Sequence, residues 1–254
     1  EKIVAASRRE LALRKTAVPA AELERKLDGL PPVRDFRAAL TAPGMQVIAE
    51  LKAASPSKGI IRQPLEVEAL AVELERSGAA ALSVLTERNY FLGGLENLER
   101  ARKVVELPLL RKDFIYDEYQ ILEARAAGAD AVLLIAAMLV PAEYRRLQKF
   151  AESLGLAVLS EAHTAGEIAM LLDNGASIVG VNARNLSTFA TDLGVVAELM
   201  GRIPADKVRV SESALKSNAD LKQMKRLGAD AFLIGETLMR AASPGKKLCE
   251  LIAK

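Results

Sequence analysis

A glycine followed by a short apolar segment recurs along the chain. The sequence Gly-Ala followed by an apolar run occurs at Gly78, Gly128, Gly175 and Gly228, and the stretch at Gly155 is a looser copy. Glycine ends a helix because it adopts the left-handed conformation without a Cβ clash. The apolar runs are continuous rather than alternating, which is typical of strands buried on both faces in a parallel sheet.

Eight apolar runs predict strands, and amphipathic stretches between them predict helices. Alternating strands and helices favour a parallel sheet, and right-handed crossovers allow eight units to close into a (β/α)8 TIM barrel, an α/β fold. An open doubly wound sheet is the alternative, but no glycine-rich dinucleotide motif follows the first strand. The strands are predicted at Gln46–Lys52, Ala80–Thr86, Leu109–Phe114, Ala131–Ala136, Ala157–Glu161, Ser177–Asn182, Val208–Ser211 and Ala231–Gly235, and helices at Leu65–Ser77, Glu118–Ala127, Ala142–Ser153 and Ala219–Leu227.

The first 45 residues precede the first predicted strand and form a helical extension. Two helices are predicted there, Glu1–Arg14 and Ala20–Leu27, with prolines as breaks between and after them. The chain has 254 residues, the usual size of one such barrel. We therefore expect a single domain over residues 1–254, with the extension at 1–45 and the barrel at 46–254.

Composition excludes several classes of function. The 35 basic and 33 acidic residues give a net charge of +2, so the chain lacks the broad basic field that binds nucleic acid or anionic membranes. One cysteine, Cys249, and one histidine, His163, are too few for a zinc site. No apolar run reaches the roughly 18 residues that span a bilayer, and the N-terminus lacks a signal-peptide core. We expect a cytoplasmic protein without a metal.

Charged and polar residues occupy the ends of the predicted strands, where barrel enzymes carry their chemistry. For any one of them the simpler interpretation is the start of a solvated loop, but five strands together favour one polar pocket with both signs of charge. Lysines and glutamates that lie close together shift each other's pKa, as acid–base catalysis requires. With a side-chain period of two, the pairs that share a face are Glu50 with Lys52, Leu110 with Lys112, Leu159 with Glu161, Gly180 with Asn182 (continuing to Arg184) and Ser211 with Ser213.

Two regions suggest a phosphate site. Ser213 follows the seventh predicted strand, and Gly235 and Glu236 follow the eighth, before a short helical stretch. Loops at these positions, with free backbone N–H groups at a helix start, commonly bind phosphate in barrels. The loop after the first strand carries Lys58, a candidate phosphate contact, next to flexible small residues. Ordinary turns are the alternative for both regions.

Several segments resemble the indole-3-glycerol phosphate synthase family, in the same order along nearly the whole chain. They are Ile48-Ala-Glu-Leu-Lys-Ala-Ala-Ser-Pro-Ser-Lys-Gly59, Leu82-Ser-Val-Leu-Thr-Glu-Arg-Asn-Tyr-Phe-Leu-Gly-Gly94, Pro108-Leu-Leu-Arg-Lys-Asp-Phe-Ile115, Gly180-Val-Asn-Ala-Arg-Asn-Leu186 and Phe232-Leu-Ile-Gly-Glu-Thr-Leu-Met-Arg240.

The resemblance implies an enzyme that converts 1-(2-carboxyphenylamino)-1-deoxyribulose 5-phosphate to indole-3-glycerol phosphate, a carboxy-lyase of tryptophan biosynthesis that uses no cofactor. It implies that Lys112 is the general acid for ring closure and that Lys52 is a second acid and holds the substrate carboxylate. Glu50 and Glu161 resemble proton-handling carboxylates. We expect a monomer that binds a small phosphorylated substrate. Other residues that resemble the family's site are Asn182, Arg184 and Ser213, with Ser55, Ala214, Gly235 and Glu236 near the phosphate and Phe91, Phe114 and Leu133 near the aromatic ring.

The chain departs from the family pattern at a few positions. Ala214 stands where the family usually has glycine, and its Cβ is expected to crowd a phosphate held by backbone N–H groups. Ala183 replaces an asparagine, and Ser160 and Ala162 stand where valine-like residues are expected. Two alternatives stay open. A desolvated Lys52 or Lys112 could form a Schiff base with a carbonyl substrate, as in a carbon–carbon lyase or isomerase on the same barrel. The changes at Ala214 and Ala183 suggest a barrel that binds a phosphometabolite without catalysis. A lone histidine near a strand end is usually structural, as is a lone cysteine in a terminal helix.

Overall fold

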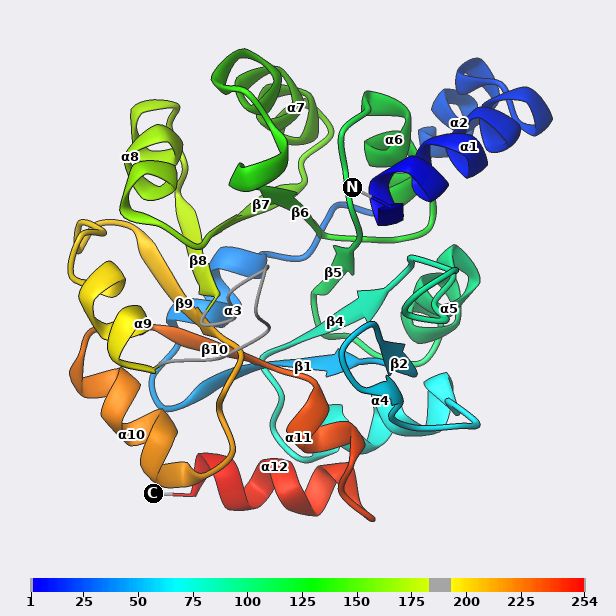
Figure 1. Cartoon of the computed structure of the whole chain (residues 1–254). Helices are drawn as coiled ribbons and strands as arrows, with labels where there is room; N and C mark the ends of the chain where they lie inside the picture. The colour runs from blue at the N-terminus through cyan, green and yellow to red at the C-terminus, as the bar shows by residue number, and fades with distance from the viewer. Residues whose placement is uncertain (1, 183–192, 254) are drawn as a thin grey trace.

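A closed barrel of parallel strands forms the centre of the molecule, in a computed structural model that describes residues 2–182 and 193–253. Neighbouring strands pair in parallel around the ring in the order β1-β10-β9-β8-β7-β6-β5-β4, which confirms the predicted fold (Figure 1). The barrel strands are β1 (Gln46–Leu51), β4 (Ala81–Leu85), β5 (Leu109–Lys112), β6 (Ala131–Ile135), β7 (Ala157–Ala162), β8 (Ile178–Asn182), β9 (Val208–Glu212) and β10 (Ala231–Ile234).

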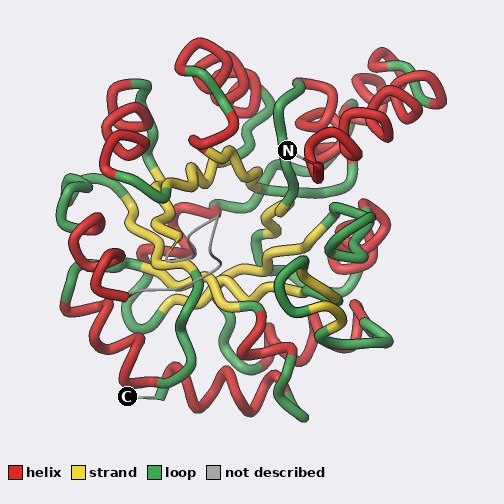
Figure 2. Tube along the Cα trace, in the orientation of Figure 1, coloured by secondary structure: helices red, strands yellow, loops and turns green. Residues whose placement is uncertain are grey.

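Helices surround the strands, as Figure 2 shows by the red segments outside the yellow ring. The glycines that end four of these helices, from Gly78 to Gly228, have φ between +88° and +99°, as the repeated Gly-Ala sequence predicted. None of the described helices is long and apolar enough to cross a membrane. The helices are α1 (Lys2–Ala17), α2 (Ala20–Leu27), α3 (Phe36–Thr41), α4 (Val67–Arg76), α5 (Leu95–Arg102), α6 (Glu118–Ala126), η1 (Ala136–Met138), α7 (Pro141–Ser153), α8 (Ala165–Asp173), α9 (Leu193–Met200), α10 (Asn218–Arg226), α11 (Glu236–Met239) and α12 (Pro244–Ile252).

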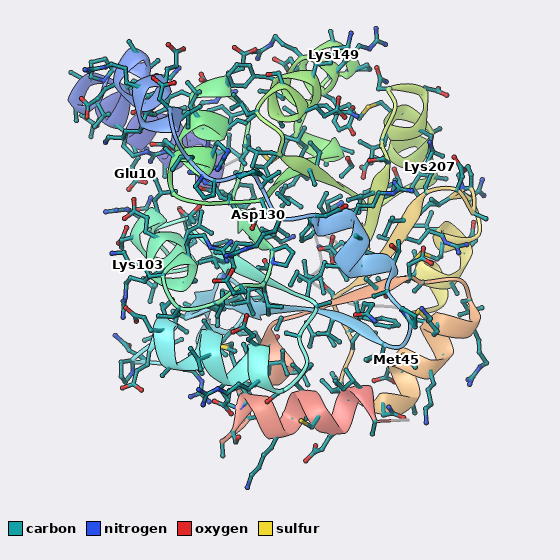
Figure 3. The ribbon with its side chains drawn as sticks, turned by 180° about the vertical axis from the view of Figure 1, so that it is seen from behind. Glu10, Met45, Lys103, Asp130, Lys149 and Lys207 are labelled. Atoms are coloured by element: carbon teal, nitrogen blue, oxygen red, sulfur yellow. The ribbon has the colours of Figure 1, made fainter. Side chains whose placement is uncertain are left out.

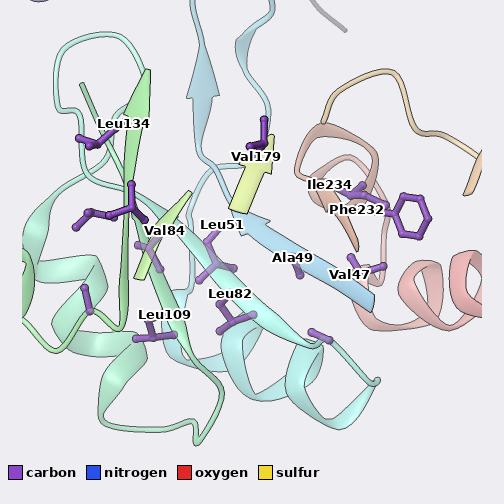
Figure 4. Packing of buried hydrophobic residues seen from close by; sticks show 14 of the residues in the cluster. Val47, Ala49, Leu51, Leu82, Val84, Leu109, Leu134, Val179, Phe232 and Ile234 are labelled. Carbon is purple, nitrogen blue, oxygen red and sulfur yellow. The ribbon is translucent and has the colours of Figure 1, made fainter. Parts of the chain in front are cut away.

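Each strand buries one set of side chains against the helices and the other set inside the barrel. On β1, Val47, Ala49 and Leu51 belong to the larger core between sheet and helices (Figure 4). Ile48 points inward and belongs to the smaller core within the barrel. Because side chains alternate along a strand, Glu50 also faces the barrel interior, one step closer to the carboxyl end.

A short helix that the sequence did not predict closes the amino end of the barrel. α3 buries Phe36 and Leu40 in the core within the barrel, and Asp35 caps it by accepting a hydrogen bond from the Ala38 backbone N–H at 2.8 Å. Figure 3 shows α3 in blue across this end. The candidate site lies at the other mouth of the barrel, at the carboxyl ends of the strands.

The N-terminal extension is held against α6 by polar contacts. Arg14 on α1 donates to Glu123 on α6, with Nε 2.7 Å from Oε1, and the Tyr119 hydroxyl donates to the Val18 carbonyl at 2.7 Å. The extension also reaches the opposite mouth from α3, because Val4 lines the cavity there. The N-terminal extension therefore packs against α6 and also contributes to the wall of the cavity.

The loop after β1 contains a small hairpin where the sequence indicated only a loop or turn. β2 (Ala54–Ser55) pairs antiparallel with β3 (Gly59–Ile60). Gly59, the first residue of β3, has φ +63°, a conformation that glycine adopts easily. The hairpin fixes the part of this loop that carries Lys58 at the rim of the barrel.

Candidate active site

A cavity of about 710 Å³ opens at the carboxyl ends of the barrel strands. The structure brings nearly all the predicted site residues to this mouth, as the strand-end pattern required. Among the described residues, no group of three histidine, cysteine, aspartate or glutamate side chains is placed to hold a metal. The predicted residues that line the cavity are Glu50, Lys52, Lys58, Phe91, Lys112, Phe114, Leu133, Glu161, Asn182, Ser213, Ala214, Gly235 and Glu236.

Two predicted residues are not among those that line the cavity. Ser55 lies in β2 and is buried, and it is not among the residues that line the cavity, so its place near the phosphate stays a prediction. Its neighbours Pro56, Ser57 and Lys58 line the cavity instead. Arg184, like the neighbouring Ala183, lies outside the described residues.

Lys112 lies at the centre of the charged cluster. Its Nζ is 2.6 Å from Oε2 of Glu161 and 3.1 Å from Oε2 of Glu212. Burial on its own lowers the pKa of Lys112, but the charges of Glu161, Glu212 and Glu50 outweigh burial, and the net pKa is raised. Lys112 is therefore a cation at neutral pH, able to donate a proton and poor as a nucleophile.

The two carboxylates at Lys112 differ in their affinity for a proton. Burial raises the pKa of each. For Glu161 the charges of Lys112 and His163 reverse this effect, and its pKa falls below the usual value. For Glu212 burial dominates, the charge of Glu161 adds to it, and the pKa rises to about 8. Two carboxylates that share one lysine titrate as a unit, and within this pair Glu212 binds a proton more tightly than Glu161 does.

Glu212 was missed by the sequence analysis. The prediction that Ser211 and Ser213 share the inward face of this strand is wrong for Ser211, because Val208 and Val210 point into the barrel. Val208, Val210 and Glu212 are two residues apart, so they share one face of the strand. This spacing could have predicted that Glu212 points into the barrel. The predicted strand ended one residue too early to include it.

Glycine on the neighbouring strand makes room for Glu212. A Cβ at Gly180 on β8 would lie 2.1 Å from Oε1 of Glu212, a distance that real Cβ atoms do not show. Gly235 has the same relation to the second ion pair of the site, because a Cβ there would lie 2.4 Å from Oε1 of Glu50. That oxygen accepts from Lys52 Nζ at 2.6 Å. Both positions exclude any larger side chain while these carboxylates stay in place.

Apolar side chains form one wall of the cavity. The rings of Phe91 and Phe114 lie with centroids 6.2 Å apart and planes at 52°, a tilted arrangement favourable for aromatic pairs, and Leu133 lines the same cavity. The loop that carries Phe91 is held by Glu87, whose carboxylate accepts three backbone N–H groups, from Asn89 to Phe91, at 2.8–3.0 Å. The cavity therefore offers a preformed surface for an aromatic ring.

The loop after β9 has an unusual backbone. Ser213 has φ +64° and Ala214 has φ +60°, both in the left-handed region that favours glycine. The Ser213 hydroxyl donates to Oδ1 of Asn182 at 2.7 Å, which joins the ends of β8 and β9. Two further cations that the sequence analysis did not single out, Lys216 and Arg240, line the cavity near this loop. Lys216 and Arg240 thus add positive charge to the cavity that the predicted phosphate loops line.

Ser160, a departure noted in the sequence, lies on the outer face of β7 and not in the cavity. Its hydroxyl is 2.7 Å from the hydroxyl of Tyr144 on α7, and both side chains are buried. Burial raises the pKa of Tyr144 to about 12, so the phenol stays protonated and able to donate. The polar serine at this position is therefore satisfied by a partner across the helix–sheet interface.

A cationic lysine in contact with buried carboxylates, at the mouth where barrel enzymes work, places the protein among the (β/α)8-barrel enzymes that use acid–base chemistry. The chain belongs to the indole-3-glycerol phosphate synthase family, whose sequence model matches residues 1–251.

Relatives named indole-3-glycerol phosphate synthase match the sequence of this chain over nearly their whole length. The protein of Koribacter versatilis (strain Ellin345) is 49% identical over 249 residues, which are 97% of this chain and 95% of the relative. That of Alkaliphilus metalliredigens (strain QYMF) is 45% identical over 252 residues, 99% of this chain and 97% of the relative.

Solved structures resemble the chain in fold alone. A mutant tryptophan synthase alpha-subunit from Pyrococcus furiosus gives a TM-score of 0.65 at 13% identity, over 83% of this chain and 99% of that chain. 3-Hexulose-6-phosphate synthase from Salmonella typhimurium gives a TM-score of 0.66 at 15% identity, over 82% of this chain and 96% of that chain.

Proposed function

We propose that the protein converts 1-(2-carboxyphenylamino)-1-deoxyribulose 5-phosphate to indole-3-glycerol phosphate, with loss of carbon dioxide and water. The observation that carries the proposal is the cationic Lys112, held at 2.6 Å from Glu161 and 3.1 Å from Glu212 at the mouth of the barrel. Acid–base steps without a cofactor need such a donor beside an ionised acceptor.

The two ends of the substrate match opposite parts of the cavity. Its aromatic ring fits the apolar wall of Phe91, Phe114 and Leu133, and its phosphate fits the loops that carry Ala214 and Gly235. In this orientation the ketone lies between the two ends, within reach of the charged cluster. Lys52 is the cation we assign to the carboxylate of the substrate, a role that competes with its ion pair to Glu50.

Ring closure begins when the ring carbon that bears the carboxylate attacks the ketone carbon. The new carbon–carbon bond forms as the carbonyl π bond breaks, and Lys112 gives its proton to the ketone oxygen, where negative charge develops. Carbon dioxide then leaves, and its bonding electrons restore the aromatic ring. In the last step the hydroxyl leaves as water with a proton from an acid, and Glu161 accepts a proton from the carbon next to nitrogen.

The Schiff-base alternative requires a neutral, nucleophilic lysine with a lowered pKa. Lys112 has a raised pKa and so lacks that property, and Lys52 is engaged in an ion pair with Glu50 at 2.6 Å. Treatment with borohydride in the presence of substrate separates the two mechanisms. We expect no gain in protein mass, whereas a reduced adduct on Lys52 or Lys112 would favour the Schiff base.

Turnover by the purified protein tests the proposal directly. We expect the fluorescent indole product to form from the substrate in buffer containing a chelator, and we expect the gene to restore growth of a tryptophan auxotroph that lacks this step. Binding of the substrate without product would contradict the proposal and favour a phosphometabolite-binding barrel.

The proposal includes a cytoplasmic monomer that acts on a small phosphorylated substrate and has no nucleic-acid or membrane partner. The large exposed hydrophobic residues of the described part of the chain, such as Leu13, Ile60 and Val195, lie on separate elements, which supports a monomer. Light scattering on the eluting protein tests this point, and we expect the mass of one chain.

A further inference from the structure

His163 lies next to the Glu161 carboxylate and is not among the residues that line the cavity. It follows β7, and its Nε2 is 3.4 Å from Oε1 of Glu161, while Lys112 binds the other oxygen, Oε2, at 2.6 Å. The imidazole is 9% exposed. One carboxylate is thus held by a cation on one oxygen and by a histidine on the other.

A second carboxylate holds the far side of the imidazole. Oε2 of Glu167, in the first turn of α8, is 3.6 Å from Nδ1 of His163 and also accepts the backbone N–H of His163 at 2.6 Å. The two ring-nitrogen distances are those of an ion pair rather than of a short hydrogen bond. The imidazole therefore lies between two carboxylates, one at the site and one at the helix start.

The surroundings of the imidazole favour its protonated form. Burial lowers the pKa of His163, but Glu167, Glu161 and Glu212 together outweigh burial, and the net pKa is raised. These three carboxylates come from α8, β7 and β9, and Lys112 faces the same cluster from β5. A positive charge on His163 stabilises the ionised form of Glu161 more than that of Glu212, which His163 contacts in no ion pair.

We propose that His163 is a positioning residue, which holds Oε1 of Glu161 and so makes Glu161, rather than Glu212, the carboxylate of the pair that ionises first. This inference rests on the proposed function, in which Glu161 accepts the proton. It gives the only histidine of the chain a part in the reaction without contact to the substrate. Glu167 supports it by keeping the imidazole protonated.

Proton NMR tests the charge on His163 without any substrate. Because the sequence has one histidine, its ring protons can be followed through a pH titration without ambiguity. We expect His163 to titrate above 6.5 and its midpoint to fall in Glu167→Gln, which keeps an acceptor for the backbone N–H but removes the charge. Glu143→Gln is the matched control, because Glu143 has the same place in the first turn of α7 and accepts the Val140 N–H. A midpoint at or below 6.5, or one that Glu167→Gln leaves unchanged, would overturn the inference.

The pH dependence of kcat/KM tests the effect on the carboxylate pair. In His163→Gln the Glu161–Glu212 pair loses a neighbouring positive charge, so we expect the acid limb of the profile to move to higher pH by on the order of one unit, with KM little changed. A loss of activity that is equal at all pH values, or an unshifted profile, would show a merely structural role. If the wild-type chain shows no turnover, the proposed function fails, and the NMR titration still decides whether His163 is held as a cation.

Discussion

Replacing Ala214 with glycine should stabilise the protein. Ala214 has φ +60°, and an L residue in the left-handed region costs about 1–2 kcal/mol because its Cβ lies too close to the carbonyl oxygen. Glycine avoids this cost but loses about 0.5–1 kcal/mol more in backbone entropy on folding. The net gain in the free energy of unfolding is on the order of 0.5–1 kcal/mol, which corresponds to a rise in Tm of roughly 1–4 °C for a protein of this size.

Urea unfolding measures the change in stability of Ala214→Gly, and calorimetry measures the change in its binding of phosphate. Ala42→Gly is the matched control, since Ala42 is exposed and has φ −60°, where glycine should lower stability. If the Cβ of Ala214 also crowds the anion, titration with inorganic phosphate will show tighter binding in Ala214→Gly. Destabilisation equal to that of Ala42→Gly would refute the strain argument, and unchanged or weaker phosphate binding would refute the steric one.

Two further variants test the carboxylate cluster. The pKa of Glu212 is raised in the folded state, to about 8, so its contribution to stability is fully present below the unfolded value of 4.5 and is lost as the pH rises toward 8. Glu212→Gln should therefore gain stability relative to the wild type between pH 5 and pH 9, measured by urea unfolding, and a pH-independent difference would contradict this. Gly180→Ala should displace Glu212 and lower kcat, whereas Gly166→Ala, where a Cβ meets nothing within 4 Å, should leave kcat unchanged and slightly stabilise α8. Equal kcat in both alanine variants would show that Glu212 can move without consequence.

The strands were predictable because their signal is local. A continuous apolar run after a helix-ending glycine is readable without knowledge of the fold, and period two then places Glu50 and Lys112 on the inner face. The same rule failed at β9 because the predicted strand stopped at Ser211 and because its inward face was assigned to Ser211 rather than to Val210. α3 was missed because a six-residue helix between prolines carries little periodicity, and its stability comes from burial of Phe36 and Leu40 inside the barrel.

Contacts across the barrel were beyond the reach of the sequence. The sharing of Lys112 by Glu161 and Glu212 joins three strands and depends on barrel closure and register. The contact between His163 and Glu161 depends on the path of the loop after β7, which composition does not determine. The family resemblance led us to expect crowding of a phosphate by the Cβ of Ala214, but the left-handed backbone at this residue came from the structure.

The rate of product formation by Lys112→Met tests the central claim most directly. Methionine keeps the bulk of the side chain but removes the proton donor that Glu161 and Glu212 hold at the mouth of the barrel. We predict that kcat falls by roughly 10²–10⁴-fold, the usual contribution of one general acid, with a smaller change in substrate affinity. Lys52→Met, measured beside it, should weaken substrate binding as well, and circular dichroism should show both variants folded. A kcat near that of the wild type in folded Lys112→Met would contradict the account and move the role of main acid to Lys52.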